Sequence, residues 1–354
     1  MPLDEPTLLA LAPERLPNLR VARYGGDGMA VRMDDLTSDD ARNVRRLYVA
    51  LSALLGALRE ALCIPAGDGT APGGFSNGSP DIADTTAECI DAAQKVLTHT
   101  SKDPHWREAI IAARALRGPA VSGDSIQRQA LHDIRGGALA ALALTIDLAG
   151  YGRISTADVV RSFYLTRDHL KIMRNALEDI DAPARARDTM QRDHGTHLLF
   201  EKWTSAEHRQ PDDRSAHVNV DSDYDGPVSQ RCLEFSALDR VLYNLMNNAV
   251  RFASDRVVDL HLRAVNENLR FIVANRTSAD HRNALRERYA NELGKLFLGN
   301  FTTGGEGVGM SICAEFVANA FGLSNATKAV KGGYVGAELI DDDFVAWFHW
   351  PVGT

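Results

Sequence analysis

The chain has 354 residues, 45% of them hydrophobic and 24% charged, enough to build the cores of about two domains. It carries 39 basic and 47 acidic side chains, a formal net charge of -8, so it offers no excess of positive charge to neutralise nucleic-acid phosphates. The cysteines lie far apart with no CxxC pair, which predicts neither a disulfide framework nor a thiolate zinc site and favours a reducing compartment. They are Cys63, Cys89, Cys232 and Cys313.

The sequence predicts no membrane span. Its longest purely apolar run, from Ala138 to Leu144, is far shorter than the ~20 residues that a hydrocarbon core demands. Acidic residues at Asp4 and Glu5 interrupt the N-terminus, which therefore lacks the basic and then apolar pattern of a signal peptide. We expect a cytoplasmic protein.

Residues 1–118 read as a helical domain. Leucine and valine recur at three- and four-residue spacings between Asp40 and Leu62, the pattern of an amphipathic helix. Glycine, proline and serine dominate the loop 65–80, and two further helical patterns follow at 82–97 and 106–116. The domain shows no repeat or motif, so a sensory or partner-binding role is the default expectation.

Residues 119–192 predict a pair of helices. The first runs from Ser125 to Leu148, and Ser155 or Thr156 caps the second. The second helix places apolar residues at alternating gaps of four and three, a heptad-like seam that must face partner helices. The seam residues are Val159, Phe163, Thr166, Leu170, Met173, Leu177 and Ile180.

A hairpin of two helices cannot bury the apolar faces of both helices by itself. Two chains that pair their hairpins into a four-helix bundle would bury them. A bundle completed within one chain fits the pattern equally well. Two adjacent glycines, Gly136 and Gly137, each cost about 1 kcal/mol against alanine in a helix interior, so a local bend is expected there. That bend could serve mobility or close helix packing.

Residues 193–354 predict an α+β domain. A strand is expected at 197–203, and Ser236 precedes a strong helix with Asp239 placed as in a capping box. Alternating apolar residues around short turns predict two hairpins of antiparallel strands. Their strands cover 257–265 with 269–274, and 334–340 with 344–350.

Three short segments carry side chains suited to phosphate chemistry. On the predicted helix, Asn244, Asn248 and Arg251 fall at i, i+4 and i+7, so two carboxamides and a guanidinium share one face. Carboxamide oxygens can ligate Mg²⁺, and arginine can pair with phosphate oxygens. A solvated polar face is the alternative for the two asparagines taken alone.

The second segment, Gly304-Gly305-Glu306-Gly307-Val308-Gly309, opens a helix that starts at Met310. Backbone N–H groups at such a glycine-rich helix start can approach phosphate oxygens, although surface loops often look similar. The third segment places His132 beside Asp133, a pairing in which the carboxylate can receive the imidazole proton and make the ring a phosphoryl acceptor. Taken alone, His132 would pass for an incidental surface histidine.

In chain order His132 comes first, the asparagine helix second and the glycine-rich loop third. In that order the three segments resemble the catalytic core of two-component sensor histidine kinases, over roughly residues 125–354. The resemblance implies a dimerisation and phosphoacceptor hairpin at 119–192 and a Bergerat-fold, α/β-sandwich ATP-binding domain at 193–354. It further implies an ATP-dependent kinase that transfers phosphate through His132 to the aspartate of a separate response-regulator receiver domain. The implied assembly is a homodimer, and the chain becomes a phosphoprotein of a signal-transduction pathway.

The resemblance also assigns individual residues. His132 matches the phosphoacceptor and Asp133 its acidic helper. Asn248 would hold Mg²⁺, with Asn244 as its partner and Arg251 near the phosphates of ATP. Gly305, Gly307, Gly309 and Met310 fall in the second glycine box, and Phe297–Thr303 where a flexible ATP lid begins.

Two departures from the family pattern stand out. Asn275 occupies the place of the aspartate that accepts from the adenine amino group, and the glycines that usually follow are absent. Gly136 replaces the small polar residue that orients water for dephosphorylation. The alternative to an active kinase is therefore a catalytically degenerate phosphotransfer or scaffold protein. An ATPase of the same fold is disfavoured, because the asparagine helix lacks a glutamate to activate water.

Overall fold

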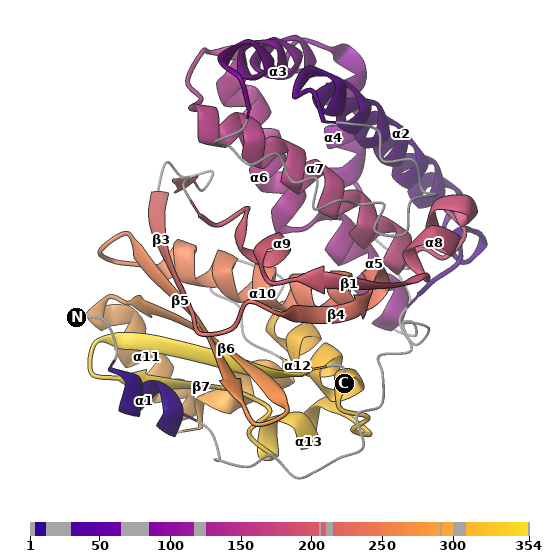
Figure 1. Cartoon of the computed structure of the whole chain (residues 1–354). Helices are drawn as coiled ribbons and strands as arrows, with labels where there is room; N and C mark the ends of the chain where they lie inside the picture. The colour runs from indigo at the N-terminus through magenta and orange to yellow at the C-terminus, as the bar shows by residue number, and fades with distance from the viewer. Residues whose placement is uncertain are drawn as a thin grey trace. The chain divides into compact units, whose positions relative to one another are not determined.

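The computed structural model describes residues 4–11, 30–64, 85–116, 125–204, 207–209, 215–290, 292–299 and 309–352 (Figure 1). The chain forms two compact units. Met29–Ala186 make up the helical unit, and Met1–Gly28 together with Arg187–Thr354 make up the sheet unit. The predicted boundary near residue 118 thus falls inside one compact unit, and the separate roles expected for 1–118 and 119–192 stay predictions.

The helical unit is built from capped helices. Its elements are η2 (Met33–Asp35), α2 (Ser38–Ala61), α3 (Ala87–Thr100), α4 (Pro104–Arg114), α5 (Ser125–Arg135), α6 (Gly137–Gly150) and α7 (Thr156–Ala176). Helix α8 (Ala182–Asp188) spans the sequence boundary between the units. The predicted cap of α7 is confirmed: Ser155 Oγ accepts from the backbone N–H of Asp158 at 3.2 Å, and the Asp158 carboxylate accepts from the backbone N–H of Ser155 at 2.9 Å.

The predicted helix from Ser125 to Leu148 is broken into α5 and α6. The break is at Gly136, which has φ -76° and ψ -172°, so the expected bend at the paired glycines is confirmed. A Cβ built on Gly136 would lie 3.0 Å from the carbonyl oxygen of His132. Glycine therefore permits a close approach of the chain to the turn that carries His132.

A disulfide joins Cys63, just after α2, to Cys89 in the first turn of α3, with a Cα–Cα distance of 6.2 Å. The prediction that the cysteines form no disulfide is therefore wrong for this pair. The two residues lie 26 positions apart in sequence, and only the packing of α3 on α2 brings them together. Within the described residues, Cys232 and Cys313 form no disulfide.

The sheet unit contains a six-stranded sheet in the order β2-β3-β5-β6-β8-β7 and a separate pair, β1-β4. Its strands are β1 (Gln191–Gly195), β2 (His208–Arg209), β3 (Ser215–Ser222), β4 (Pro227–Arg231), β5 (Val257–Val265), β6 (Asn268–Arg276), β7 (Val335–Ile340) and β8 (Asp343–Pro351). Its helices are α1 (Glu5–Ala10), α9 (His197–Phe200), α10 (Cys232–Phe252), α11 (Ala279–Tyr289), η3 (Leu293–Leu298), α12 (Gly309–Ala320) and α13 (Ala326–Lys331).

Both predicted hairpins are present, as β5–β6 and β7–β8. Each turns on a residue with positive φ, Asn266 at 55° and Asp341 at 52°, residue types that tolerate this conformation. The expectation of antiparallel strands fails at one pair, because β3 runs parallel to β5. The connection between those strands contains α10, and parallel neighbours require such a crossover.

Two local predictions in this unit are wrong. The segment from His197 to Trp203 begins with the short helix α9 instead of a strand, because a brief apolar run does not distinguish a strand from a buried helical turn. Helix α10 begins at Cys232, one turn before the predicted cap at Ser236, which is 2% exposed inside the helix. Asp239 consequently has another role, described below.

The two faces of the main sheet are both covered. Leu11, directly after α1, packs with Ile272, Ala274, Val345 and Trp347 on one face. Alternation along the strands places Phe271 and Phe348 on the other face, where their rings stack at 4.7 Å. Helix α10 packs against β5 and β6, and α12 packs against β8 (Figure 1). Within the described residues, no helix is both long and apolar enough to cross a membrane.

Candidate functional site

Helix α10 carries the predicted asparagine face. Its opposite side is buried as expected, with Leu242, Leu245 and Met246 no more than 2% exposed. Asn244, Asn248 and Arg251 are partly exposed on the remaining face. The three polar side chains therefore stand on a rigid helix whose apolar side is fixed in the core, as a ligand-binding face requires.

A buried ion pair anchors the first half of α10. The ammonium of Lys202 donates to both carboxylate oxygens of Asp239, at 2.7 and 2.8 Å, and both side chains are at most 3% exposed. Next to it the ring of Trp203 lies 5.1 Å from that of Tyr243. Sequence reasoning missed this pair because it took Asp239 for a helix cap and the residues around Lys202 for a strand.

The start of α12 meets the asparagine face. A Cβ added to Gly309 would lie 3.4 Å from Asn244 Oδ1, so the backbone of Gly309 lies close to the Asn244 side chain. One turn on, the thiol of Cys313 donates to the carbonyl oxygen of Gly309 at 3.2 Å. Burial raises the pKa of Cys313 to about 12, and a hydrogen bond with Asn244 partly opposes that rise. The thiol is thus neutral and serves as a packing group behind the site.

The end of β6 carries Asn275, the residue expected to contact adenine. Asn275 is 4% exposed, and its Nδ2 donates to the carbonyl oxygen of Arg276 at 3.3 Å. Two residues later Thr277 is 1% exposed, and its hydroxyl has no hydrogen-bond partner within the described residues. A buried hydroxyl without a partner costs free energy unless water or a ligand satisfies it. Thr277 was not singled out from the sequence, although it lies two positions after Asn275.

The remaining predicted elements are only partly described. Gly305 and Gly307 lie outside the described residues, as does most of the expected lid 297–303. Gly309 and Met310 are the first two residues of α12. Phe297, at the start of the expected lid, is buried in η3.

His132 and Asp133 lie in the helical unit, near the end of α5. The His132 side chain is 21% exposed, and its Nδ1 lies 3.6 Å from Asp133 Oδ1. The neighbours Leu131 and Ile134 are at most 2% exposed, so they face the interior of the helical unit. The imidazole is therefore partly exposed, and its buried Nδ1 edge faces a carboxylate.

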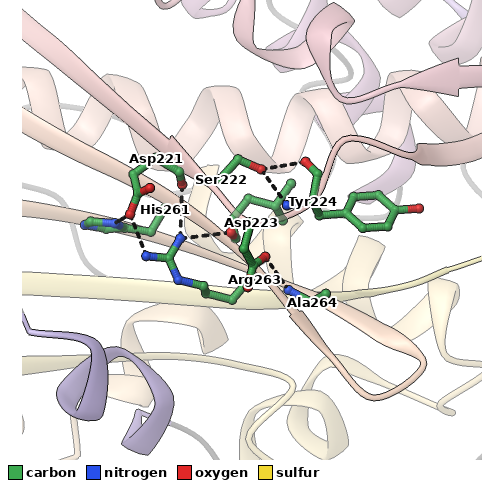
Figure 2. A network of polar contacts seen from close by, with 8 residues as sticks. Asp221, Ser222, Asp223, Tyr224, His261, Arg263 and Ala264 are labelled. Carbon is green, nitrogen blue, oxygen red and sulfur yellow. Dashed lines mark hydrogen bonds and ion pairs between the residues drawn. The ribbon is translucent and has the colours of Figure 1, made fainter.

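A second polar cluster connects the parallel strands β3 and β5 (Figure 2). The Asp221 carboxylate accepts from Arg263 Nη2 at 2.5 Å and lies 3.2 Å from His261 Nδ1. These two neighbours lower the pKa of Asp221, Arg263 more than His261. The Asp223 carboxylate accepts from the backbone N–H of Ala264 at 2.9 Å. The cluster holds the end of β3 to β5, which makes it structural.

Residues 234–339 match the family of histidine kinase-, DNA gyrase B- and HSP90-like ATPases. They form an ATPase domain of this family. The matched range includes α10, the end of β6 and α12, the elements that carry Asn244, Asn275 and Gly309. A sequence search among curated proteins found no match.

Solved structures of histidine kinases show distant similarity. The catalytic domain of histidine kinase ThkA aligns at 22% identity over 38% of this chain and 78% of its own, with a TM-score of 0.28. Full-length ShkA in complex with AMPPNP aligns at 20% identity over 61% and 42%, with a TM-score of 0.32. The histidine kinase domain of a blue-light activated kinase from Erythrobacter litoralis aligns at 13% over 74% and 92%, with a TM-score of 0.30. These alignments are too distant to support the assignment of residues 234–339 to the ATPase family, which rests on the family match alone.

Proposed function

We propose that the protein is an ATP-dependent histidine kinase that phosphorylates its own His132. The observation that carries the proposal is the meeting of the Asn244 side chain with the first residue of α12, inside a domain of an ATPase family. The accessible His132 beside a carboxylate supplies an acceptor in the other unit. One chain would thus carry both the nucleotide site and the acceptor.

The sheet unit would bind the nucleotide between α10 and the N-terminus of α12. Backbone N–H groups at the start of α12 suit phosphate oxygens, and the Arg251 guanidinium can pair with a further phosphate. Asn248, with Asn244 as its partner, offers the carboxamide oxygen that would hold Mg²⁺, a donor that fits this hard cation. When bound, the ion would neutralise phosphate charge that develops in the transition state. Asn275 and the unpartnered hydroxyl of Thr277 would contact the adenine end.

His132 would attack the γ-phosphorus in line. The Asp133 carboxylate faces Nδ1 and favours the proton there, which leaves the Nε2 lone pair as the nucleophile. The Nε2–P bond forms while the bond from phosphorus to the bridging oxygen of ADP breaks, and the ring then releases its Nδ1 proton toward Asp133 or water. Most of the catalysis in such a step comes from positioning and charge neutralisation.

The phosphoryl group would next pass to the aspartate of a separate response-regulator receiver domain, in a cytoplasmic two-component pathway. The homodimer implied by the family resemblance is one of two ways to close the α7 seam, and helices of the same chain are the other.

The second candidate is a protein that relays phosphate through His132 but does not use ATP. The observation that favours it is Asn275, which lacks the charge of an aspartate and whose amide group already donates to a neighbouring carbonyl. Its adenine contact would be weaker than that of a carboxylate, since hydrogen bonds to charged groups are roughly twice as strong.

Nucleotide titration by calorimetry separates the two candidates. A kinase should bind ATP in a Mg²⁺-dependent manner, and Asn248→Ala should abolish that binding. Asn247→Ala, a substitution at the adjacent partly exposed asparagine of the same helix, is the matched control and should bind like the wild type. Absence of binding by the wild-type chain would rule out the kinase and leave the relay.

A further inference from the structure

Helix α7 is the central helix of the helical unit. Of its 21 residues, 16 are buried, and α2, α3, α5 and α6 pack around it. The seam predicted from the heptad pattern is closed: its first six residues are all at most 5% exposed. They are Val159, Phe163, Thr166, Leu170, Met173 and Leu177. A second chain is therefore not needed to bury this seam.

The chain's own N-terminal helices cover it. The apolar stripe of α2 is buried where the helix packs against α7, α3 and α4. Its members are Val44, Leu47, Leu51, Leu54 and Leu58, none more than 4% exposed. Helix α3 adds Ala93 and Leu97, both fully buried. The core of a four-helix bundle is formed in the same way, by apolar side chains of neighbouring helices that pack against one another.

Polar contacts fix the N-terminal segment to the end of α7. The backbone N–H of Val31 donates to the Ala176 carbonyl at 2.9 Å, and that of Glu178 donates to the Val31 carbonyl at 3.1 Å. On α2 the hydroxyl of Tyr48 donates to the Asp181 carboxylate at 2.7 Å. Directional bonds of this kind specify one register between the N-terminal segment and α7.

Two hydrogen bonds and one close backbone approach hold the other helices of the hairpin. Where α3 and α6 end, Thr98 Oγ1 donates to the Ala149 carbonyl at 3.3 Å, and a Cβ on Gly150 would lie 2.6 Å from Ser101 Oγ. Arg135, at the end of α5, donates to the Leu116 carbonyl at 2.8 Å. All three helices of the broken hairpin, α5, α6 and α7, are thus attached to the N-terminal part of the chain.

We infer that α2 and α3 occupy the place on α7 that the hairpin of a second copy would otherwise take, so that one chain closes its own bundle and works as a monomer. The N-terminal helices are then part of the phosphoacceptor unit. Combined with the proposed kinase function, on which this second part rests, the inference means that ATP bound by a chain phosphorylates His132 of the same chain.

The mass of the full chain in solution tests the first part, without any kinase activity. Light scattering after size exclusion, repeated over a wide range of concentration, should give the mass of one chain throughout. The mass of two chains would overturn the inference. This readout stands even if the wild type never incorporates phosphate, so a failure of the proposed function is recognised separately.

A matched pair of substitutions on α2 tests the occupied seam. Leu51→Asp places a charge on the buried stripe, whereas Val49→Asp changes a side chain that is 67% exposed on the same helix. The first should lower the melting temperature and convert the monomer to larger species, and the second should leave both unchanged. A Leu51→Asp chain with the mass and melting temperature of the wild type would contradict the inference.

Mixing two inactive variants tests the second part. Asn248→Ala keeps the acceptor but loses the nucleotide site, and His132→Ala keeps the nucleotide site but loses the acceptor. The mixture should remain unlabelled by γ-labelled ATP while the wild type is labelled. Label on the Asn248→Ala chain would show transfer between chains and overturn the same-chain step.

Discussion

The two compact units are stabilised in different ways, and the difference explains why one was easier to predict. In the sheet unit, main-chain hydrogen bonds pair each strand with a definite neighbour, and short turns such as Asn266-Glu267 fix the register. In the helical unit, the apolar faces of the helices determine how the helices pack, and such a face can pack against any helix with a complementary apolar face. The sequence of a helix therefore predicts that its apolar face is buried, but it does not predict which helix buries it.

The largest expected effect breaks the anchor of α10 in the sheet unit. Asp239→Leu leaves the Lys202 ammonium buried without its carboxylate, and removing one partner of a buried pair costs about 3–5 kcal/mol. Hydrogen exchange should show faster opening of α10 with no change in α7. The double substitution Lys202→Met with Asp239→Leu is the control and should recover most of the stability. Equal destabilisation of both units by Asp239→Leu would contradict their independence.

The next effect is confined to the helical unit. Replacing Cys63 and Cys89 by serine opens a covalent loop of 26 residues, which lowers the free energy of unfolding by about 2–4 kcal/mol. Denaturant titration followed by hydrogen exchange should place that loss in α2 and α3. Cys232→Ser, in the sheet unit, is the control for loss of a thiol. A double variant as stable as the oxidised wild type would refute a stabilising role for the disulfide.

Acid should destabilise each unit through a deeply buried histidine. Burial lowers the pKa of His169 on α7 to about 4, and burial together with Arg270 lowers that of His349 on β8 to about 3. Unfolded histidine titrates near 6.5, so below that pH the unfolded chain binds a proton that the folded chain refuses. Stability should therefore fall as the pH drops from about 6.5 toward 4, by up to about 1.4 kcal/mol per pH unit for each group.

Glutamine separates the two contributions, because it cannot take up the proton. His169→Gln should flatten the pH dependence of the helical unit alone, and His349→Gln that of the sheet unit alone, as read from hydrogen exchange at several pH values. An unchanged slope between pH 6.5 and 4.5 in either variant would contradict the assignment for that histidine.

The smallest effect concerns two helical-unit glycines with opposite expectations. Gly136→Ala pushes a Cβ against the His132 carbonyl oxygen and should cost about 1 kcal/mol. Gly56→Ala, within α2, meets open space and should stabilise the helix by about 0.5–1 kcal/mol. Thermal unfolding of both variants checks the signs. A stabilising Gly136→Ala would mean that the break in α5–α6 is not required by the fold.

The sequence was most informative where chemistry depends on spacing within one element. The face of Asn244 and Asn248, the Ser155 cap, the bend at Gly136 and the two hairpins all follow from local patterns. Contacts between distant segments left no such pattern. The Lys202–Asp239 pair, the Cys63–Cys89 disulfide and the covering of α7 by α2 depend on which elements pack together, which no window of sequence contains. Thr277 escaped notice because only burial makes its hydroxyl informative.

The central claim is that ATP held by the sheet unit phosphorylates His132 of the helical unit. The most direct measurement is peptide mapping by mass spectrometry of the full chain after incubation with Mg²⁺ and ATP, under alkaline conditions that preserve phosphohistidine. The account predicts one phosphorylated peptide, with the phosphate on His132, absent in His132→Ala and in Asn248→Ala. The control is His99→Ala, which changes an exposed histidine on α3 and should still be phosphorylated. A phosphate on any other residue, or none at all on the wild-type chain, would contradict it.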